Sequence, residues 1–209
     1  HRVDRRQRQM CIRDRCSHTM FIFAGSKRHL MNNMFNSPSK PFYQSSIGMG
    51  LKAIPQETYI KFANRMFEER GKHIERTVTE KVYSMFAGYT WFVQMMMNEL
   101  FALTAHGEWC KTDKIETARK NVIQTQDSLY REILANLATK QKQVLQAIAK
   151  EREAQGITSS AFIKKYNLPS ASSVQAAVKG LIEKDLITQT DGVYRVYDYF
   201  FADWLATEY

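Results

Sequence analysis

Residues 186–197 read LITQTDGVYRVY, two short runs rich in β-branched and aromatic residues around one polar dipeptide. Strands favour these residue types. The dipeptide, Asp191-Gly192, is typical of a two-residue hairpin turn, because both central residues of that turn need positive φ. The stretch therefore predicts a β-hairpin near the end of the chain.

Three helices are predicted directly before this hairpin. The third can be capped by Ser170 or Ser172. Its apolar stripe, at helical spacing, consists of Val174, Ala177, Val178, Leu181 and Ile182. A short second helix covers 158–166, and the first is marked by Gln141, Val144, Leu145 and Ile148. Three helices followed by a hairpin indicate a winged helix-turn-helix over residues 139–209.

Residues 55–138 are predicted to form a small helical domain. Pro55 begins the first helix, which ends before Gly71, and the second ends at Gly88. Thr90 can cap a third helix that is apolar on nearly every side and must therefore lie in the middle of a bundle. A fourth helix follows Thr112, and a fifth runs toward residue 137. The apolar positions of the other four helices are Tyr59, Phe62, Ala63, Met66 and Phe67; Val78, Val82, Met85 and Phe86; Ile115, Ala118 and Val122; and Leu129, Ile133, Leu134 and Leu137.

Residues 20–24 are a short apolar run that ends at Gly25-Ser26, as a buried strand ends at a turn. A lone buried strand cannot satisfy its own backbone polar groups, so this one implies a sheet whose other strands lie outside the chain. We therefore expect a chain that begins within a domain. A helix is predicted over 27–35, and 37–41 is a turn-rich linker.

The first 19 residues are interpreted as a non-native, basic segment. Residues 10–15 read MCIRDR, which resembles the translation of a transposon end used in sequencing libraries. Two functional alternatives stay open for this segment. It is a basic arm that binds nucleic acid, or it is a metal site made by Cys11, Cys16 and His18.

The composition fits a soluble, cytoplasmic protein. No apolar run approaches the ~20 residues that span a bilayer, and three cysteines are too few for a disulfide framework. The net charge of +9 suits a polyanionic partner such as nucleic acid. Six arginines and two aspartates lie within residues 1–15, however, which leaves +5 for the remainder. The charge argument for nucleic acid is thereby weakened.

Six segments, taken in order, resemble the prokaryotic ATPases of the AAA+/STAND group, often called archaeal-type ATPases. The likeness covers about residues 20–205 and rests on the order of the segments rather than on any one motif. The segments are 21–31 (FIFAGSKRHLM), 41–45 (PFYQS), 88–94 (GYTWFVQ), 162–168 (FIKKYNL), 172–175 (SSVQ) and 196–205 (VYDYFFADWL).

The resemblance implies a mainly α chain in three parts: the end of a P-loop core over 20–54, a helical lid over 55–138 and a winged helix over 139–209. It implies that residues 20–24 are the sensor-1 strand of the core. Gly25, Ser26 and Arg28 would then lie near the γ-phosphate, where a hydroxyl can report its presence. The turn at Gly88 and Thr90 would pack near the adenine, although family members commonly have proline where this chain has Thr90. A Gly-Ser turn before a helix that begins with basic residues is also common in ordinary loops. The alternative that these residues have no role in nucleotide sensing therefore stays open.

The sequence has no Gly-x-x-x-x-Gly-Lys-Ser/Thr loop, which would hold the phosphates of ATP. It also has no acidic pair at a strand end to position Mg²⁺. We expect ATP and Mg²⁺ to bind the intact parent protein through a P-loop core outside this chain. The fragment itself is expected neither to bind ATP tightly nor to hydrolyse it, and no catalytic residue or metal ligand is predicted. Its lid and winged helix would act as a nucleotide-state switch and an interaction module.

The winged helix offers candidate contact residues for a partner. Ser172, Ser173, Gln175 and Lys179 lie off the apolar stripe, and Arg195 lies on the wing. They can contact a protein, or they can contact the phosphates and base edges of DNA. The third alternative is that they only form the solvent-exposed face of the helix. Few basic residues accompany them, which favours a protein partner. The alternative interpretation of the whole chain is a DNA-binding transcriptional regulator whose helical bundle serves for dimerisation.

Overall fold

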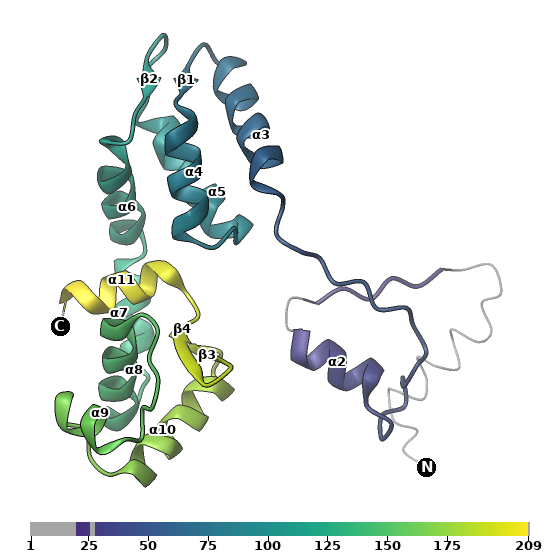
Figure 1. The fold of residues 1–209 in the computed structure, drawn as a ribbon, viewed down its shortest axis with the longest axis vertical. Coiled ribbons are helices and arrows are strands. Elements are labelled where there is room, and N and C mark those ends of the chain that lie inside the picture. The colour runs from purple at the N-terminus through teal and green to yellow at the C-terminus, as the bar shows by residue number, and fades with distance from the viewer. Residues whose placement is uncertain (1–19, 26–27, 209) are drawn as a thin grey trace. The chain divides into compact units, whose positions relative to one another are not determined.

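A computed structural model describes residues 20–25 and 28–208 of the chain. The described residues are mainly helical, as predicted (Figure 1). They divide into two compact units, of which the first ends at Lys52 and the second begins at Ala53. Among the described residues, no helix is both long enough and apolar enough to cross a membrane.

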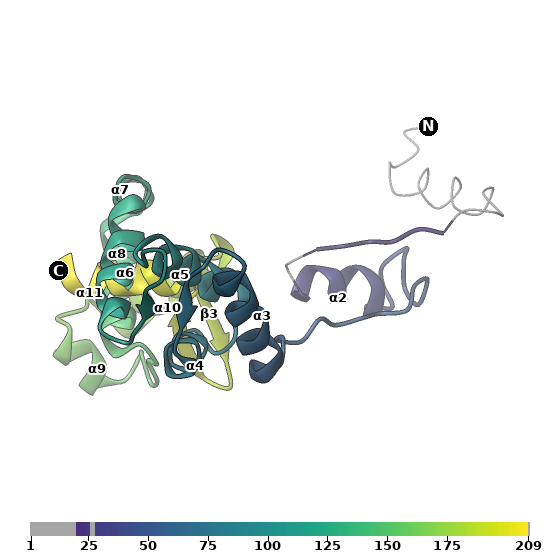
Figure 2. The same cartoon turned by 90° about the horizontal axis from the view of Figure 1, so that it is seen from above.

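The first unit is organised around one helix, α2 (Arg28–Asn36), at nearly the predicted place. Phe35 and Phe42 are buried, and the ring of Phe23 lies 5.3 Å from that of Phe35. Figure 2 shows residues 20–25 running alongside α2. These residues correct one prediction, because they are not in a strand. A strand is held by hydrogen bonds to a neighbouring strand, and no described residue supplies that neighbour.

The second unit begins with a helical bundle, as predicted. Its helices are α3 (Gln56–Glu68), α4 (Arg76–Met85), α5 (Thr90–Ala102), α6 (Lys114–Thr125) and α7 (Asp127–Ala135). A short parallel pair, β1 (His73–Ile74) with β2 (Trp109–Cys110), was not predicted, because two residues carry no detectable strand period. The fully buried side chains of α4 and α5 include Val78, Val82, Val93, Met96 and Leu100.

Two predicted helix caps are wrong. Thr90 is already the first residue of α5, and Tyr89 occupies the N-cap position without a side-chain hydrogen bond. A capping residue needs an extended backbone, which a residue inside the helix does not have. Likewise, Asp113 rather than Thr112 precedes α6.

The winged helix has the predicted order of elements. Its helices are α8 (Thr139–Glu151), α9 (Ser160–Lys165) and α10 (Ala171–Glu183), and its strands are β3 (Ile187–Thr190) and β4 (Val193–Val196). The strands pair antiparallel with Thr190 opposite Val193, and both turn residues, Asp191 and Gly192, have positive φ. Ser170 accepts a hydrogen bond from the backbone N–H of Ser173, so it is the cap of α10. On the other side of β4, Ala154 forms an isolated bridge to Tyr194.

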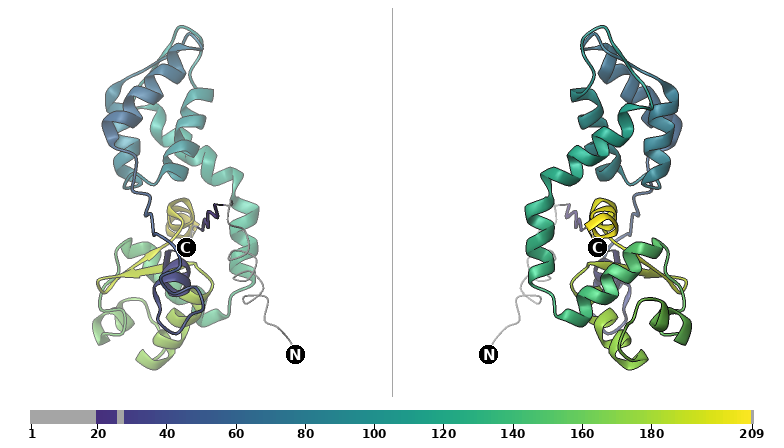
Figure 3. Two further views of the ribbon diagram at one scale, coloured as in Figure 1. Left: turned by 90° about the vertical axis from the view of Figure 1, so that its right-hand side faces the viewer. Right: turned by 90° about the vertical axis from the view of Figure 1, so that its left-hand side faces the viewer.

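A last helix, α11 (Tyr199–Glu208), was not predicted. Figures 1 and 3 show it lying between the helical bundle and the winged helix, in contact with α6 on one side and α8 on the other. Phe200, Phe201, Trp204 and Leu205 are buried in it. The bundle and the winged helix consequently share one continuous hydrophobic core.

Candidate functional site

The turn between α4 and α5 requires glycine at position 88. Ala87 and Gly88 both have positive φ, and the backbone N–H of Gly88 donates to the carbonyl of Tyr83 at 3.0 Å. A Cβ on Gly88 would lie 2.5 Å from the Tyr83 hydroxyl oxygen. That hydroxyl in turn donates to the carbonyl of Ile54 at 2.7 Å. A side chain at position 88 would therefore have to displace the Tyr83 hydroxyl, which is the group that donates to Ile54.

The predicted nucleotide-sensing residues fall in different parts of the chain. Ser26 lies outside the described residues. Gly25 stands before α2, where an added Cβ would lie 2.9 Å from the sulfur of Met31, and Arg28 is the first residue of α2. Gly88 is buried in its turn, and Thr90 is exposed at the start of α5. The role of these five residues in nucleotide sensing stays a prediction.

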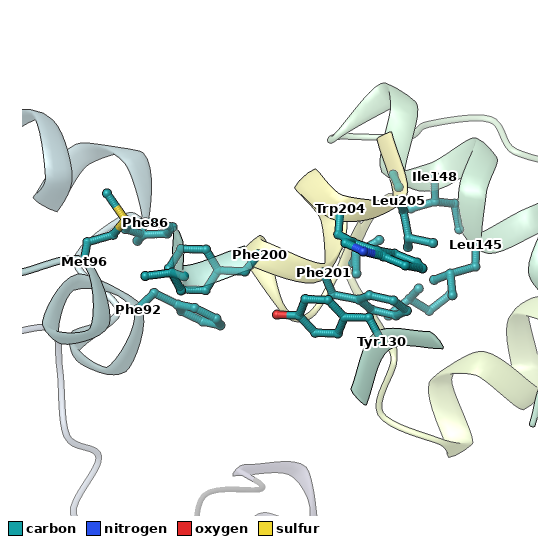
Figure 4. Close-up of a cluster of buried hydrophobic side chains, with 14 of the residues drawn as sticks. Phe86, Phe92, Met96, Tyr130, Leu145, Ile148, Phe200, Phe201, Trp204 and Leu205 are labelled. Carbon is teal, nitrogen blue, oxygen red and sulfur yellow. The ribbon is translucent and has the colours of Figure 1, made fainter. Parts of the chain in front are cut away.

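Aromatic rings connect the Gly88 turn to the start of α11. The ring of Phe200 lies 5.1 Å from that of Phe86 and 5.7 Å from that of Phe92. Tyr199 lies 5.1 Å from Phe92 and 6.0 Å from Tyr89. Ring pairs at such distances add to the free energy of burial. The start of α11 is thus packed against Phe86 and Tyr89, which flank the turn. Figure 4 shows Phe200 beside Phe86 and Phe92.

The next turn of α11 packs against the winged helix and α7. Phe201 stacks on Tyr130 with ring centroids 4.8 Å apart. The indole N–H of Trp204 donates to Oδ1 of Asp127 at 2.8 Å. Figure 4 shows Leu205 beside Leu145 and Ile148 of α8. Helix α11 therefore packs against both the helical bundle and the winged helix, the two halves of the second unit.

The buried carboxylate of Asp203 also links α11 to its neighbours by ion pairs. Asp203, on α11, accepts a hydrogen bond at Oδ2 from Nε of Arg119 on α6, at 2.7 Å. Its Oδ1 forms ion pairs with Nη2 of Arg119 and, at 2.9 Å, with Nη2 of Arg152 at the end of α8. Burial alone would lower the pKa of Arg119, but the hydrogen bond and charge of Asp203 outweigh burial and raise it. Asp203 thus joins α6, α8 and α11 through one side chain.

Asp198 caps α11. Its Oδ1 accepts hydrogen bonds from the backbone N–H groups of Phe200 at 2.8 Å and Phe201 at 3.0 Å. Burial raises the pKa of Asp198 above its ordinary value, although these two hydrogen bonds act in the opposite direction. The cap fixes where the helix begins and hence which residues face the Gly88 turn.

An open groove of about 500 Å³ lies on the winged helix between α10 and the wing. Its apolar lining comes from Ile157, Val178 and Tyr194, among others. Lys179 and Glu183 line it from α10 with opposite charges, and Gln175 and Gln189 add amide groups. Such a mixed lining suits a small segment of a partner that has both apolar and polar groups.

The predicted partner-binding residues have different surroundings. Gln175 and Lys179 are exposed and line the groove. Ser172 and Ser173 lie within hydrogen-bonding distance of the Ser170 hydroxyl at 3.0 and 3.2 Å, so they belong to the cap of α10. Arg195 forms an ion pair with Glu153 at 2.8 Å. Binding of a partner by any of these residues stays a prediction.

The sequence prediction missed the residues that join the two halves, namely Arg119, Asp203 and Tyr130. One available signal was Asp198, which is a preferred cap residue directly before the apolar run 199–205. No sequence signal pairs Arg119 with a carboxylate 84 positions away.

No group of His, Cys, Asp or Glu able to hold a metal ion occurs among the residues that the structure describes. The alternative metal site of Cys11, Cys16 and His18 lies outside them.

Comparison with known proteins identifies the C-terminal part. Residues 128–207 match a family model described as "Probable winged helix domain". This part of the chain is a winged helix domain. The match begins within α7, so it includes the helix that carries Tyr130. No curated protein sequence matches the chain.

A solved structure has a similar fold over most of the chain. It is the Walker-type ATPase of Pyrococcus abyssi, with a TM-score of 0.55 and 20% sequence identity. The similarity covers 84% of this chain and 48% of that one. At this identity the comparison shows the fold alone. The chain spans about half the length of that ATPase.

Proposed function

We propose that the chain is the C-terminal part of a Walker-type ATPase of the AAA+/STAND kind, in which a helical lid and a winged helix transmit the state of a bound nucleotide. The fold similarity to an archaeal Walker-type ATPase supports the kinship. The proposal also agrees with the sequence, which contains no phosphate-binding loop of its own.

The observation that carries the proposal is the position of α11. Its first turn packs on Phe86 and Phe92 beside the Gly88 turn, and its second turn packs on Tyr130 and the core of the winged helix. A packed core responds to displacement by a discrete repacking rather than by gradual deformation. A shift of the Gly88 turn would therefore move α11, and with it the winged helix.

In the parent protein, ATP and Mg²⁺ would bind a P-loop core that this chain does not contain. The Gly88 turn would lie near that bound nucleotide, with Thr90 at its exposed edge. The residues of this chain would then sense and relay the nucleotide, while phosphoryl transfer would depend on groups outside the chain.

The test compares the purified 209-residue chain with the same protein extended by the upstream reading frame of its gene. We expect no release of phosphate from ATP by the chain alone and Mg²⁺-dependent ATP binding by the extended protein, measured by calorimetry. Steady Mg²⁺-dependent phosphate release by the chain alone would contradict the proposal. An upstream sequence without a P-loop would contradict it as well.

DNA binding is the second candidate, favoured by the exposure of Gln175 and Lys179 on the groove of the winged helix. A gel shift of duplex DNA that weakens as salt is raised would support it. Lys179→Ala should then abolish the shift, whereas Lys61→Ala, on the exposed surface of α3, should not. Arg195→Ala should have a smaller effect, because Glu153 already neutralises that guanidinium.

A further inference from the structure

Helix α10 has one exposed face beside the groove of the winged helix. Its exposed residues recur at helical spacing. They are Ser172, Gln175, Ala176, Lys179, Ile182 and Glu183. Figure 1 shows α10 at the end of the second unit that lies away from the helical bundle. This face of α10 is therefore open to a second molecule.

Two opposite charges lie about one helical turn apart on this face. Lys179 and Glu183 both line the groove, and they stand at positions i and i+4, where side chains of one helix are neighbours. Other exposed pairs at this spacing, such as Arg76 with Glu80, form ion pairs. Neither Lys179 nor Glu183 forms an ion pair with a described residue. Each charge is thus available to an opposite charge on a partner.

An apolar side chain lies beside the two charges. Ile182 is 37% exposed, although it belongs to a helix whose other large apolar residues are buried. It lines the groove together with Val178 and Tyr194. An apolar centre with charged groups around it is the usual composition of a protein–protein contact. The face of α10 therefore has the features of a small protein interface.

The charge of the winged helix favours a protein over nucleic acid as the partner of this face. Residues 139–209 contain nine Lys and Arg and eight Asp and Glu, which leaves a net charge of +1. Binding to nucleic acid depends on several cations that neutralise phosphates. Glu183 would repel a phosphate in the groove, and Arg195 on the wing is already paired with Glu153.

We propose that this face of α10 binds the same face of a second copy of the chain, with the two helices antiparallel across a two-fold axis. In such a contact each residue of one copy meets a given residue of the other copy, and the reverse contact is also made. Lys179 of each copy then lies opposite Glu183 of the other, and the two Ile182 side chains meet near the axis. A parallel arrangement would bring like charges together. The dimer does not depend on a nucleotide, so the inference goes beyond the proposed function.

Self-association and DNA binding would exclude each other on this face. The dimer covers Gln175 and Lys179, which are the two exposed groups that DNA binding through the groove requires. A chain that binds duplex DNA through these residues must therefore be a monomer. The two occupants of the face can be told apart by the mass of the chain in solution.

Sedimentation equilibrium tests the proposal. A contact of this size gives a weak dimer, so the 209-residue chain is measured at concentrations up to about 0.5 mM. We expect Lys179→Glu and Glu183→Lys each to raise the dissociation constant of the dimer about tenfold, because like charges then face each other. Lys61→Glu, the same change of charge on exposed α3, should have no effect. Thermal unfolding should be unchanged in all three variants, because the substituted side chains are exposed.

Rescue by a second change of charge identifies the antiparallel contact. Lys179→Glu combined with Glu183→Lys in one chain should restore the dimer, and an equimolar mixture of the two single variants should form a mixed dimer. A dimer that neither single variant weakens would overturn the proposal, as would a loss that neither combination restores. A chain that stays monomeric would overturn it as well, and salt-sensitive binding of duplex DNA by that monomer would assign this face to DNA.

Discussion

Phe200 and Phe86 lie with their ring centroids 5.1 Å apart, so that the first turn of α11 is packed against the end of α4. Phe200 is fully buried. Phe200→Ala removes a large ring from a packed core and should lower the free energy of unfolding by about 3–5 kcal/mol. Urea denaturation followed by circular dichroism measures this loss. Tyr197→Ala, at an exposed site three residues earlier, is the matched control and should change stability by less than about 0.5 kcal/mol.

Asp203→Asn tests the link between α11 and Arg119. The substitution leaves the largely buried guanidinium of Arg119 with only the exposed Glu116 as a countercharge, which should cost about 3 kcal/mol. Glu116→Gln removes the other carboxylate near Arg119, but that side chain is 70% exposed, so the loss should stay below about 1 kcal/mol. Equal losses of stability in the two variants would show that Asp203 is no more important than Glu116 as a partner of Arg119.

Gly88→Ala tests the turn before α5. Two effects add here, since the left-handed backbone strains alanine and the new Cβ would clash with the Tyr83 hydroxyl. We expect a loss of about 2–4 kcal/mol in thermal unfolding. Gly192 has a similar positive φ, but a Cβ added there would meet no described atom within 4 Å, so Gly192→Ala should cost only about 1 kcal/mol. A Gly88→Ala variant no less stable than Gly192→Ala would exclude the clash.

The pH dependence of stability should report on Asp127. Hydrogen bonds from Arg131 and Trp204 lower the pKa of this carboxyl below its ordinary value of 3.8. The ionised form therefore stabilises the fold above pH 3.8, and that contribution is lost as the pH falls through the lowered pKa. Asp127→Asn keeps an acceptor for the indole but removes the charge. Its stability deficit, from urea midpoints, should shrink between pH 6 and pH 3; a deficit independent of pH would contradict the assignment.

Local signals predicted the winged helix well. The hairpin follows from Asp191-Gly192, and the cap of α10 follows from Ser170, because each depends on only a few neighbouring residues. The buried stripe of α10 was also predicted, except that Ile182 lies on the edge of the groove rather than in the core.

Long-range features could not be predicted from the sequence. Helix α11 is apolar on nearly every side, so residues 199–205 show no helical period, and only its neighbours explain its burial. The contact of Arg119 with Asp203 depends on the packing of α6 against α11. A strand was predicted over residues 20–24 because they are apolar. A strand also needs a neighbouring strand to pair with, and the described residues do not supply one.

The proposed function requires the Gly88 turn and the winged helix to respond to the nucleotide together, through α11. This response is measured by hydrogen exchange of residues 86–92 and 199–208 in the extended protein, with ATP and with ADP. We predict that both segments change between the two nucleotides, and that Phe200→Ala abolishes the change in the winged helix while keeping that of residues 86–92. Identical exchange with ATP and ADP, or a winged-helix response that survives Phe200→Ala, would overturn the proposed coupling through α11.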